Sequence, residues 1–592
     1  MKLDRMDGTK RTDYCGTLTV KDVGRKVVVC GWVQRQRDLG ALIFVDLRDR
    51  TGIVQLAFDD ATSRDVFNKA FAVRSEYVLM ATGTVRARSA VNKEIPTGEI
   101  EIEVSALKVL GTAETPPFEI LPDTGAKEDI RLQYRYLDLR RANLQRNIIM
   151  RHKIAKVTRD YFDENGFLEI ETPTLIKSTP EGARDYLVPS RIHEGHFFAL
   201  PQSPQLYKQL LMLSGFDRYM QLARCYRDED LRADRQPEFT QVDLEMSFVE
   251  MEDVFAIAEG YVKRLFKEVL NVDVKTPLPR LTYTEAMENY GSDKPDTRFD
   301  MKITDISDVV KDCGFGVFAD TVKNGGTVRA ITAKNAAGVY TRKEIDKLTE
   351  DAKGIGAKGL AFIRWVEDEP NCSFAKFLTK EEMDTVIDKT GAQKGDVVLI
   401  VADRKKTVLS VLGALRLTVA KRLNIIPDAY NFLWITEFPF FEYNEETGNY
   451  DAMHHPFTSP LDECVQYLDT APEKVFAKAY DLVLNGIELS SGSIRITDPE
   501  LQKHMFKALG LSDEEAYQKF GFLTDAFRYG APPHGGMGIG LDRLTMLMCG
   551  ADNLRDVIAF PKVSNSSELM SGAPGTVDEN QLNDLSICIK AK

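Results

Sequence analysis

Residues 14–112 hold a series of short segments in which apolar and polar side chains alternate, and this pattern constrains the fold more than any other feature of the chain. The segments read KVVVCGWVQRQ, ALIFVDLRD, GIVQLAF, YVLMATGTVRAR and EIEIEVSALKVL. A period of two residues is typical of strands with one buried face. Five such strands, with one helical stretch near residues 61–74, predict an OB-type β-barrel over residues 1–112. A sandwich and an SH3-like barrel are the alternatives.

The chain has 592 residues, which is too long for a single hydrophobic core, so we expect three or four domains in an α+β arrangement. A proline-bearing connector follows the barrel and predicts a linker over residues 113–143. A second domain is predicted in two parts, residues 144–297 and residues 426–592, the latter with a C-terminal extension. An inserted α/β domain is predicted between them over residues 298–425, where helical and strand patterns alternate.

The second domain is expected to begin with a helix over about residues 144–165. Ile154, Val157 and Tyr161 fall on one stripe, and Asn165-Gly166 supplies a stop signal. The strand FLEIETPTL follows and contains Pro173. Because proline cannot donate to a sheet ladder, this segment is expected at a sheet edge, a bend or a subunit contact.

Composition limits the classes of function. A net charge of −13 argues against indiscriminate nucleic-acid binding, yet residues 1–50 hold 11 Lys and Arg against 7 Asp, so a local polyanion site and a solvated basic face both remain open. The eight cysteines form no C-x-x-C pair, so neither a disulfide framework nor a zinc site is indicated. The N-terminus lacks an apolar signal region and no apolar run approaches the ~18 residues of a membrane span, so we expect a cytoplasmic protein without membrane contact.

The segment RCYRDEDLRADRQPEFTQVDLE, residues 224–245, interleaves four arginines with seven carboxylates. It predicts a strand, a loop and a second strand, with Arg227 at the end of the first and Asp243 and Glu245 on one face of the second. Charged groups on an interior face are costly unless they are paired or bind a ligand, so a structural salt-bridge network and a ligand site both fit. The planar fork of arginine favours a carboxylate or phosphate ligand.

Two further segments carry groups suited to anionic ligands. In HGGMGIGLDR the glycines let backbone approach a ligand, and a helix is expected near Leu541 with Arg543 in its first turn, although glycines more often mark turns. In DLVLNGIELSSGSIRI, Asp481 and Glu488 are spaced for a helix end followed by a strand start, which would bring two oxygen ligands to Mg²⁺. Each of these charges taken alone also fits a surface position.

Together these segments resemble the signature motifs of class II aminoacyl-tRNA synthetases. FLEIETPTL is similar to motif 1, RCYRDED with FTQVDLE to motif 2, and GMGIGLDR to motif 3. TPEGARDYLVPSR, QSPQLYKQLLM, YGSDKPDTR and AMHHPFT narrow the resemblance to the bacterial type of aspartyl-tRNA synthetase, and the insertion resembles the GAD domain of that group. The resemblance implies an antiparallel-sheet catalytic domain behind an OB-fold anticodon-binding domain. It also implies a ligase that activates L-aspartate with ATP and then transfers it to the 3′ end of tRNA(Asp).

The resemblance also implies roles for individual residues. Arg227 and Arg543 are implied to be catalytic, and Asp481 and Glu488 to hold Mg²⁺. The residues implied to bind aspartate are Glu181, Ser203, Gln205, Lys208, Arg227, Asp243, Glu245, His454, His455 and Arg495, with Lys208 and Arg495 clamping the side-chain carboxylate. The residues implied to bind ATP are Arg227, Asp228, Glu229, Gln236, Glu488, Gly540, Leu541, Asp542 and Arg543.

In the barrel, the resemblance implies that Phe44 stacks on the central anticodon base while Arg37 and Gln55 bind neighbouring base edges. A phenylalanine of the barrel core is the alternative interpretation of Phe44. Some relatives that also charge tRNA(Asn) carry a histidine where this chain has Leu39. We therefore expect an enzyme specific for tRNA(Asp), with a non-discriminating tRNA(Asp/Asn) ligase as the alternative.

Three rival functions would share parts of this pattern. An asparaginyl or lysyl synthetase should lack Gln205, Lys208 and Arg495 together with the large insertion. An ATP-dependent amide ligase needs no anticodon barrel, and a non-catalytic OB-bearing protein has no reason to keep the ATP-facing residues. The motif 1 resemblance further implies a homodimer with Pro173 at or near the contact.

Overall fold

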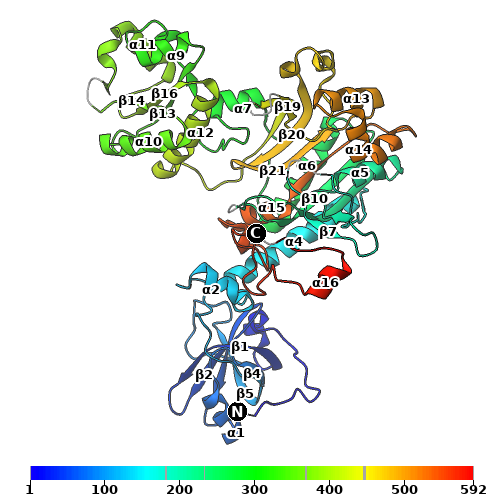
Figure 1. Ribbon diagram of the computed structural model, residues 1–592. Coiled ribbons are helices and arrows are strands. Elements are labelled where there is room, and N and C mark those ends of the chain that lie inside the picture. Colours follow the sequence, from blue (N-terminus) through cyan, green and yellow to red (C-terminus); the bar gives the residue numbers. More distant parts are fainter. Residues whose placement is uncertain (1, 180–182, 232–233, 367–369, 445–448, 591–592) are drawn as a thin grey trace. The chain divides into compact units, whose positions relative to one another are not determined.

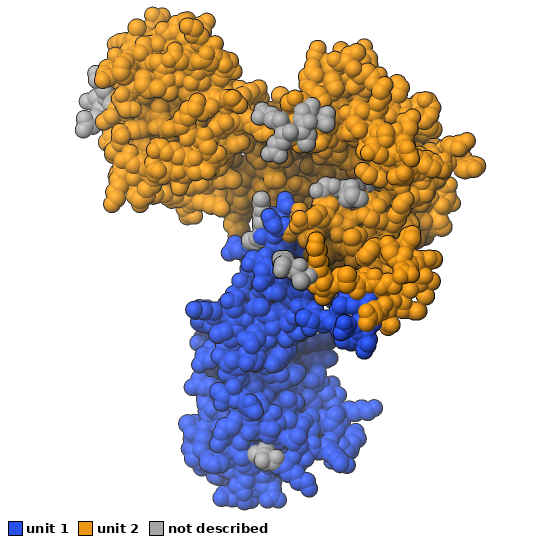
Figure 2. Space-filling model, viewed as in Figure 1, with its two compact units in different colours: residues 1–153, 230–237, 545–582 blue, residues 154–229, 238–544, 583–592 orange. Residues whose placement is uncertain are grey.

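The computed structural model describes residues 2–179, 183–231, 234–366, 370–444 and 449–590. The chain divides into two compact units (Figure 2). One unit comprises residues 1–153, 230–237 and 545–582, and the other comprises residues 154–229, 238–544 and 583–592. No helix in the described part of the chain is long and apolar enough to cross a bilayer. The domain limits given by the sequence stay a prediction.

The N-terminal part of the first unit is a closed barrel with strand order β1-β2-β3-β5-β4 (Figure 1). The strands are β1 (Lys26–Asp38), β2 (Ile43–Asp49), β3 (Gly52–Phe58), β4 (Val78–Ala87) and β5 (Ile100–Gly111), and helix α1 (Arg64–Ala72) lies between β3 and β4 in sequence. Alternate side chains such as Val29, Val45 and Leu56 are fully buried in the barrel core. The predicted OB-type barrel is confirmed.

The rest of the first unit is held by a buried ion-pair network. Short helices α2 (Glu128–Gln133) and α3 (Arg135–Asp138) precede the long helix α4 (Ala142–Glu164), close to the helix predicted at residues 144–165. Asp138 is fully buried and accepts from Arg135 at 2.6 Å and from Arg141 at 2.8 Å. Arg135 also donates to the carbonyl oxygens of Ala559 and Ile558, which fixes the C-terminal segment within this unit.

The main sheet of the second unit has the strand order β11-β17-β20-β21-β22-β10-β9-β6. The bounds are β11 (Arg280–Thr282), β17 (Phe432–Pro439), β20 (Phe476–Leu484), β21 (Ile487–Ile494), β22 (His534–Gly540), β10 (Glu238–Ser247), β9 (Arg218–Tyr226) and β6 (Leu168–Glu169). Neighbouring strands are antiparallel except for β11 with β17 and β6 with β9 at the two edges. Helices of this unit include α5 (Gln205–Leu213), α6 (Met251–Leu270), α13 (Pro499–Ala508), α14 (Asp513–Phe527) and α15 (Leu541–Cys549).

One local prediction in this sheet is corrected, and one is confirmed. Asp481 and Glu488 lie on the adjacent strands β20 and β21, and not at a helix end followed by a strand, because the Asn485-Gly486 turn closes a hairpin. The HGGMGIG segment is strand β22, in which Gly535 and Gly536 allow close approach of the neighbouring strands, and the approach of its backbone to a ligand stays a prediction. The segment after Phe167 does lie at a sheet edge, as the short strand β6, while Pro173 lies beyond the end of that strand.

The inserted region follows helix α7 (Tyr283–Tyr290) and contains an antiparallel sheet of order β12-β13-β16-β14-β15 (Figure 1). Its strands are β12 (Thr304–Asp305), β13 (Thr327–Ala333), β14 (Ala361–Arg364), β15 (Asn371–Cys372) and β16 (Val397–Asp403), and its helices are α8 (Ser307–Val310), α9 (Gly316–Lys323), α10 (Arg342–Ile355), α11 (Lys380–Thr390) and α12 (Lys405–Leu423). Apolar clusters cover both faces of this sheet, so the insertion has its own core.

Candidate active site

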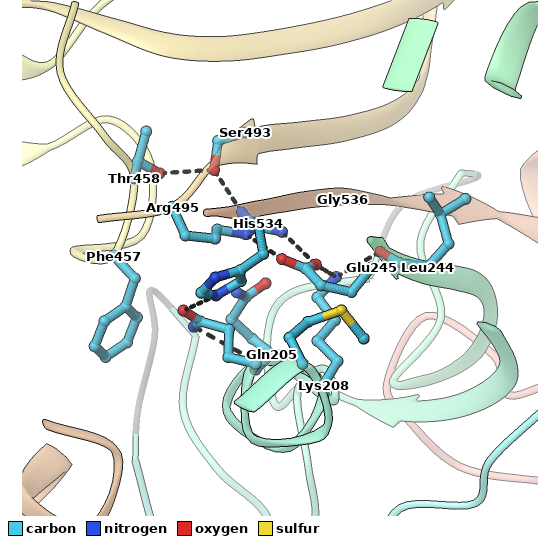
Figure 3. Close-up of polar contacts among 12 residues, drawn as sticks. Gln205, Lys208, Leu244, Glu245, Phe457, Thr458, Ser493, Arg495, His534 and Gly536 are labelled. Atoms are coloured by element: carbon cyan, nitrogen blue, oxygen red, sulfur yellow. Dashed lines mark hydrogen bonds and ion pairs between the residues drawn. The ribbon is translucent and has the colours of Figure 1, made fainter. Parts of the chain in front are cut away.

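The predicted acidic pair lies in the middle of the main sheet, on strand β10. Val242 and Leu244 enter the core, while Asp243 and Glu245 point to the opposite face and are 2% and 0% exposed. Lys208 of helix α5 approaches both carboxylates, with Nζ 2.9 Å from Asp243 Oδ1. Its Nζ also lies 3.3 Å from Glu245 Oε2 (Figure 3). Gly536 of the adjacent strand makes room, because a Cβ there would lie 2.3 Å from Glu245 Oε2.

Arg495 reaches the same carboxylate from the end of strand β21 (Figure 3). Its Nε and Nη2 donate to the two oxygens of Glu245 at 2.8 and 3.0 Å, a two-pronged geometry. Its Nη1 donates to Ser493 Oγ and, at 2.6 Å, to Nε2 of His455. Segments far apart in sequence therefore bring Lys208, Glu245 and Arg495 to one buried point.

The buried charges of this cluster are balanced, with two cations against two carboxylates. Burial alone would raise the pKa of Glu245, but Arg495 and Lys208 outweigh it and bring that pKa to about 2. Burial raises the pKa of Asp243 to about 6, since Lys208 only partly offsets it and Glu245 adds repulsion. Asp243 Oδ2 is buried and has no hydrogen-bond partner among the described residues, which leaves an acceptor available to a ligand.

Both predicted histidines lie beside Arg495. Burial, followed by the Arg495 charge, lowers the pKa of His454 to about 4 and holds that of His455 well below its usual range. His455 is therefore neutral near pH 7 and accepts from Arg495. Nε2 of His454 is buried without a partner in the described part of the chain.

Several supporting residues were missed by the sequence analysis. Ser493 accepts from Arg495 and is itself contacted by Thr458 at 3.2 Å. His534 is fully buried, with Nδ1 2.7 Å from the Pro532 carbonyl oxygen and Nε2 3.2 Å from Oε1 of Gln209. The segments SSGS and PPHGG carry two of these side chains, but only the fold shows that they lie behind the charged cluster.

Three further residues were predicted to bind aspartate. Gln205 begins helix α5 three residues before Lys208, and its Nε2 is buried and unpaired within the described ranges. Ser203 lines a small pocket with Ile176, Gln202 and Tyr207. Glu181 lies outside the described residues.

Arg227 follows strand β9, as predicted, and its guanidinium lies 5.1 Å from the ring centre of Phe239 on strand β10. Its Nε is buried, and no described residue accepts from it. The stacked ring orients the fork and leaves this donor available for an anion. Asp228 lies next to Arg227, and its backbone N–H donates to the Arg184 carbonyl oxygen at 3.0 Å. Glu229 is half-buried.

The pair predicted for Mg²⁺ lies on the neighbouring hairpin. Burial, and next the charge of Glu488, raise the pKa of Asp481 well above its ordinary range, so the two carboxylates are close enough to repel. Asp481 Oδ1 is buried and has no partner within the described ranges. In the described chain no set of three His, Cys, Asp or Glu side chains is arranged to hold a metal ion.

The motif 3 residues lie next to this hairpin, where Arg543 donates through Nη1 to the Glu488 carbonyl oxygen at 2.6 Å. Asp542 is buried and accepts from the Thr240 backbone N–H at 2.7 Å, and Leu541 is buried in the core. A Cβ at Gly540 would make ordinary van der Waals contacts, 3.6 Å from the Cβ of Arg543 and 3.8 Å from the Leu489 carbonyl oxygen. Gln236 belongs to the first unit, where its amide pairs with the backbone of Lys562 in both directions.

On the barrel, the three residues predicted to contact bases are gathered on adjacent strands. Phe44 is half-buried, between the core residues Ile43 and Val45, so it is not a core side chain. Arg37 lies opposite Phe44 in the β1–β2 ladder, and its Nη2 donates to Gln55 Oε1 at 2.8 Å. Leu39, in the turn that follows β1, is 68% exposed.

Comparison with known proteins agrees with this architecture. A family model for tRNA synthetases class II (D, K and N) matches residues 127–564, and one for an OB-fold nucleic acid binding domain matches residues 27–110. The chain therefore belongs to the class II aminoacyl-tRNA synthetases. Within that class it is 59% identical to an aspartate–tRNA ligase of Ruminiclostridium cellulolyticum, over 99% of both chains. It is 57% identical to an aspartate–tRNA(Asp/Asn) ligase of Caldanaerobacter subterraneus subsp. tengcongensis, again over 99% of both.

Solved structures show the same fold at low sequence identity. An aspartyl-tRNA synthetase from Entamoeba histolytica superimposes with a TM-score of 0.58 at 20% identity, covering 95% of this chain and 94% of that one. An asparaginyl-tRNA synthetase from Pyrococcus horikoshii complexed with asparaginyl-adenylate gives a TM-score of 0.58 at 18% identity, covering 93% and 98%.

Proposed function

We propose that the protein is an aspartate–tRNA ligase, which forms aspartyl-adenylate from L-aspartate and ATP and then transfers the aspartyl group to tRNA(Asp). The observation that carries the proposal is the buried set Lys208, Arg495, Asp243 and Glu245, in a chain whose full-length relatives are named for this activity. The set combines fixed cations with an unpaired carboxylate oxygen. An acidic amino acid offers the complementary groups, namely an ammonium and a side-chain carboxylate.

The pairing of the cations refines how aspartate would be preferred over asparagine. Both cations already face carboxylates, so the preference does not depend on unbalanced positive charge. The three N–H donors of Lys208 face Asp243, Glu245 and the Leu244 carbonyl oxygen, and four of the five N–H donors of Arg495 face Glu245, Ser493 and His455, so the position of each cation is fixed. A side-chain carboxylate would accept from the donor left on Arg495 and would be attracted by both cations, whereas the NH₂ of asparagine would face that donor with a donor of its own.

The activation step would rest on alignment and on charge stabilisation. The aspartate carboxylate attacks the α-phosphorus of ATP, and pyrophosphate leaves. Arg227, with an unpaired buried N–H, would bind the α-phosphate oxygens as charge develops there. Asp228 and Glu229 would border the nucleotide, as would Arg543 and the backbone at Gly540.

The carboxylates of Asp481 and Glu488 fit a hard cation, since they supply oxygen ligands and one buried oxygen has no partner in the described structure. Mg²⁺ bound there with ATP would neutralise phosphate charge. The protein's own contribution is to hold the two carboxylates on adjacent strands, at a separation set by the β20–β21 ladder.

In the barrel, Phe44 would stack on a splayed anticodon base, while Arg37 and Gln55 would bind base edges, because their side chains gather on its outer face. The relatives include one named aspartate–tRNA ligase and one named aspartate–tRNA(Asp/Asn) ligase. Whether tRNA(Asn) is charged as well as tRNA(Asp) is therefore a separate question. Because position 39 is leucine, we assign the protein to the ligases specific for tRNA(Asp).

The test is aminoacylation with purified tRNA(Asp) and tRNA(Asn), using labelled aspartate and asparagine in separate reactions. Charging of tRNA(Asp) with aspartate alone is the expected result. Charging of both tRNAs with aspartate would refute the role of Leu39, while the assignment as an aspartate–tRNA ligase would stand. Aspartate-dependent pyrophosphate exchange without charging of either tRNA would refute tRNA as the acceptor of the aspartyl group. Sedimentation of the active enzyme tests the homodimer expected through the segment around Pro173. Fractionation of the source cells tests the cytoplasmic location.

A further inference from the structure

The loop that leads into the insertion, residues 291–298, is tied to the segment that leaves it. Asp296 is 3% exposed and binds the Arg298 guanidinium at 3.0 and 2.7 Å. Arg298 Nη1 also donates to the Pro427 carbonyl oxygen at 3.3 Å. The entry and exit of the insertion are thereby joined at its base.

The same loop packs on the turn of the β20–β21 hairpin. Gly486 has φ +82°, and a Cβ there would lie 3.0 Å from the Cβ of Asp296. Thr297 accepts from Asn431 at 2.9 Å, and the Asn431 backbone N–H donates to the Asn485 side chain of the turn at 2.8 Å. The base of the insertion is therefore fixed against the hairpin that carries Asp481 and Glu488.

This packing brings a cation to the acidic pair. Lys294 Nζ lies 3.6 Å from Glu488 Oε2, and its side chain is about half exposed. Its charge is also felt at Asp481, whose pKa burial raises most, followed by Glu488 and then Asp293, while Lys294 acts in the opposite direction. Neither Asp293 nor Lys294 received a role from the sequence, although both stand in YGSDKPDTR.

We propose that Lys294 is the counter-ion of the Asp481–Glu488 pair in the nucleotide-free enzyme, and that it gives way when a divalent cation binds there. The inference rests on the proposed function in one respect, namely that Asp481 and Glu488 form the cation site. The physical reason is competition, because an ammonium near 3.6 Å and a divalent cation both need the same carboxylate oxygens. Lys294 is thus a positioning residue that sets how tightly the empty site takes a metal ion.

The test measures Mn²⁺ binding to the full-length enzyme at pH 8, without ATP, aspartate or tRNA, by electron paramagnetic resonance of free Mn²⁺. Lys294→Met should bind Mn²⁺ about threefold to tenfold more tightly than the parent, a range limited by the partial exposure of the pair. Lys294→Arg should stay close to the parent, because it keeps the charge. Lys302→Met, an exposed lysine further along the entry to the insertion, is the matched control and should change nothing.

A double-mutant cycle assigns the effect to this pair. In a Glu488→Gln background, Lys294→Met should no longer tighten Mn²⁺ binding, because the contact is already removed. Unchanged or weaker affinity of Lys294→Met in the parent background overturns the proposal. So does an effect that persists with Glu488→Gln, or the absence of measurable Mn²⁺ binding to all of the variants. Failure to charge tRNA would instead count against the proposed function, and these binding measurements do not depend on it.

Discussion

Arg495 binds Glu245 through two N–H···O hydrogen bonds of 2.8 and 3.0 Å, although the residues are 250 positions apart in sequence. Both side chains are almost fully buried. Such a fork fixes the direction of each remaining N–H donor of the arginine, which an ammonium cannot do.

Arg495→Lys should therefore lower kcat/KM for aspartate in pyrophosphate exchange by about tenfold to 100-fold, which corresponds to the loss of one charge-assisted hydrogen bond. The charge of the cluster is retained, so the thermal midpoint should fall only slightly. An exchange rate equal to that of the parent enzyme would contradict the assignment of Arg495 to the substrate carboxylate.

Lys208→Met removes the cation that Asp243 and Glu245 share. The cost of breaking such a buried pair is about 2–5 kcal/mol, so kcat/KM for aspartate should fall about 30-fold or more. ATP binding measured by calorimetry is the control, since Lys208 does not contact the hairpin or Arg227. Normal activation by a correctly folded Lys208→Met protein would refute the clamp.

Asp243→Asn should change how stability depends on pH. Because burial raises the pKa of Asp243 to about 6 in the folded protein, above the ordinary value for an aspartate, the native state holds a proton that the unfolded chain releases. This group therefore lowers stability as the pH rises from about 4 to 6. Between pH 4.5 and 6.5 the thermal midpoint of Asp243→Asn should fall less, or rise more, than that of the parent. Identical pH profiles of the two proteins would show that Asp243 titrates normally.

Gly492→Ala tests the packing of strand β21 behind the site. A Cβ at this position would lie 2.4 Å from the Gly536 carbonyl oxygen and 2.5 Å from the ring of Tyr480, so the sheet must shift at a cost of about 1–3 kcal/mol. A lower thermal midpoint and weaker aspartate activation are expected. Gly359→Ala is the matched control, because nothing lies within 4 Å of a Cβ there, and it should leave both quantities unchanged.

Phe44→Ala should impair tRNA charging without affecting adenylate formation. Loss of a stacked base costs about 1–3 kcal/mol, so kcat/KM for tRNA(Asp) should fall about fivefold to 150-fold while pyrophosphate exchange stays constant. Phe71→Ala removes an exposed ring of helix α1 and serves as the control. Retained discrimination against a tRNA with an exchanged anticodon would exclude stacking by Phe44.

The sequence by itself determined the barrel, the edge position of the short strand after Phe167 and the side chains of the charged site. The alternation in residues 26–58 and the alternation of Val242 and Leu244 with Asp243 and Glu245 are local patterns, and the strand period translates them directly into faces. The positions of Asp481 and Glu488 were misassigned locally, because an Asn-Gly turn between two buried apolar runs was taken for a helix end.

Only the tertiary structure decided which groups meet. In the structure, Lys208 and Arg495 both contact the Glu245 carboxylate, and Lys294 at the base of the insertion lies next to Glu488. Phe44 is half-buried and lies outside the barrel core. Sheet order joins β10 to β22 and β21, and such contacts between distant segments leave no periodic signal in a single sequence. The balance of charge in the site is therefore a property of the fold, because it depends on distances between side chains that the sequence keeps far apart.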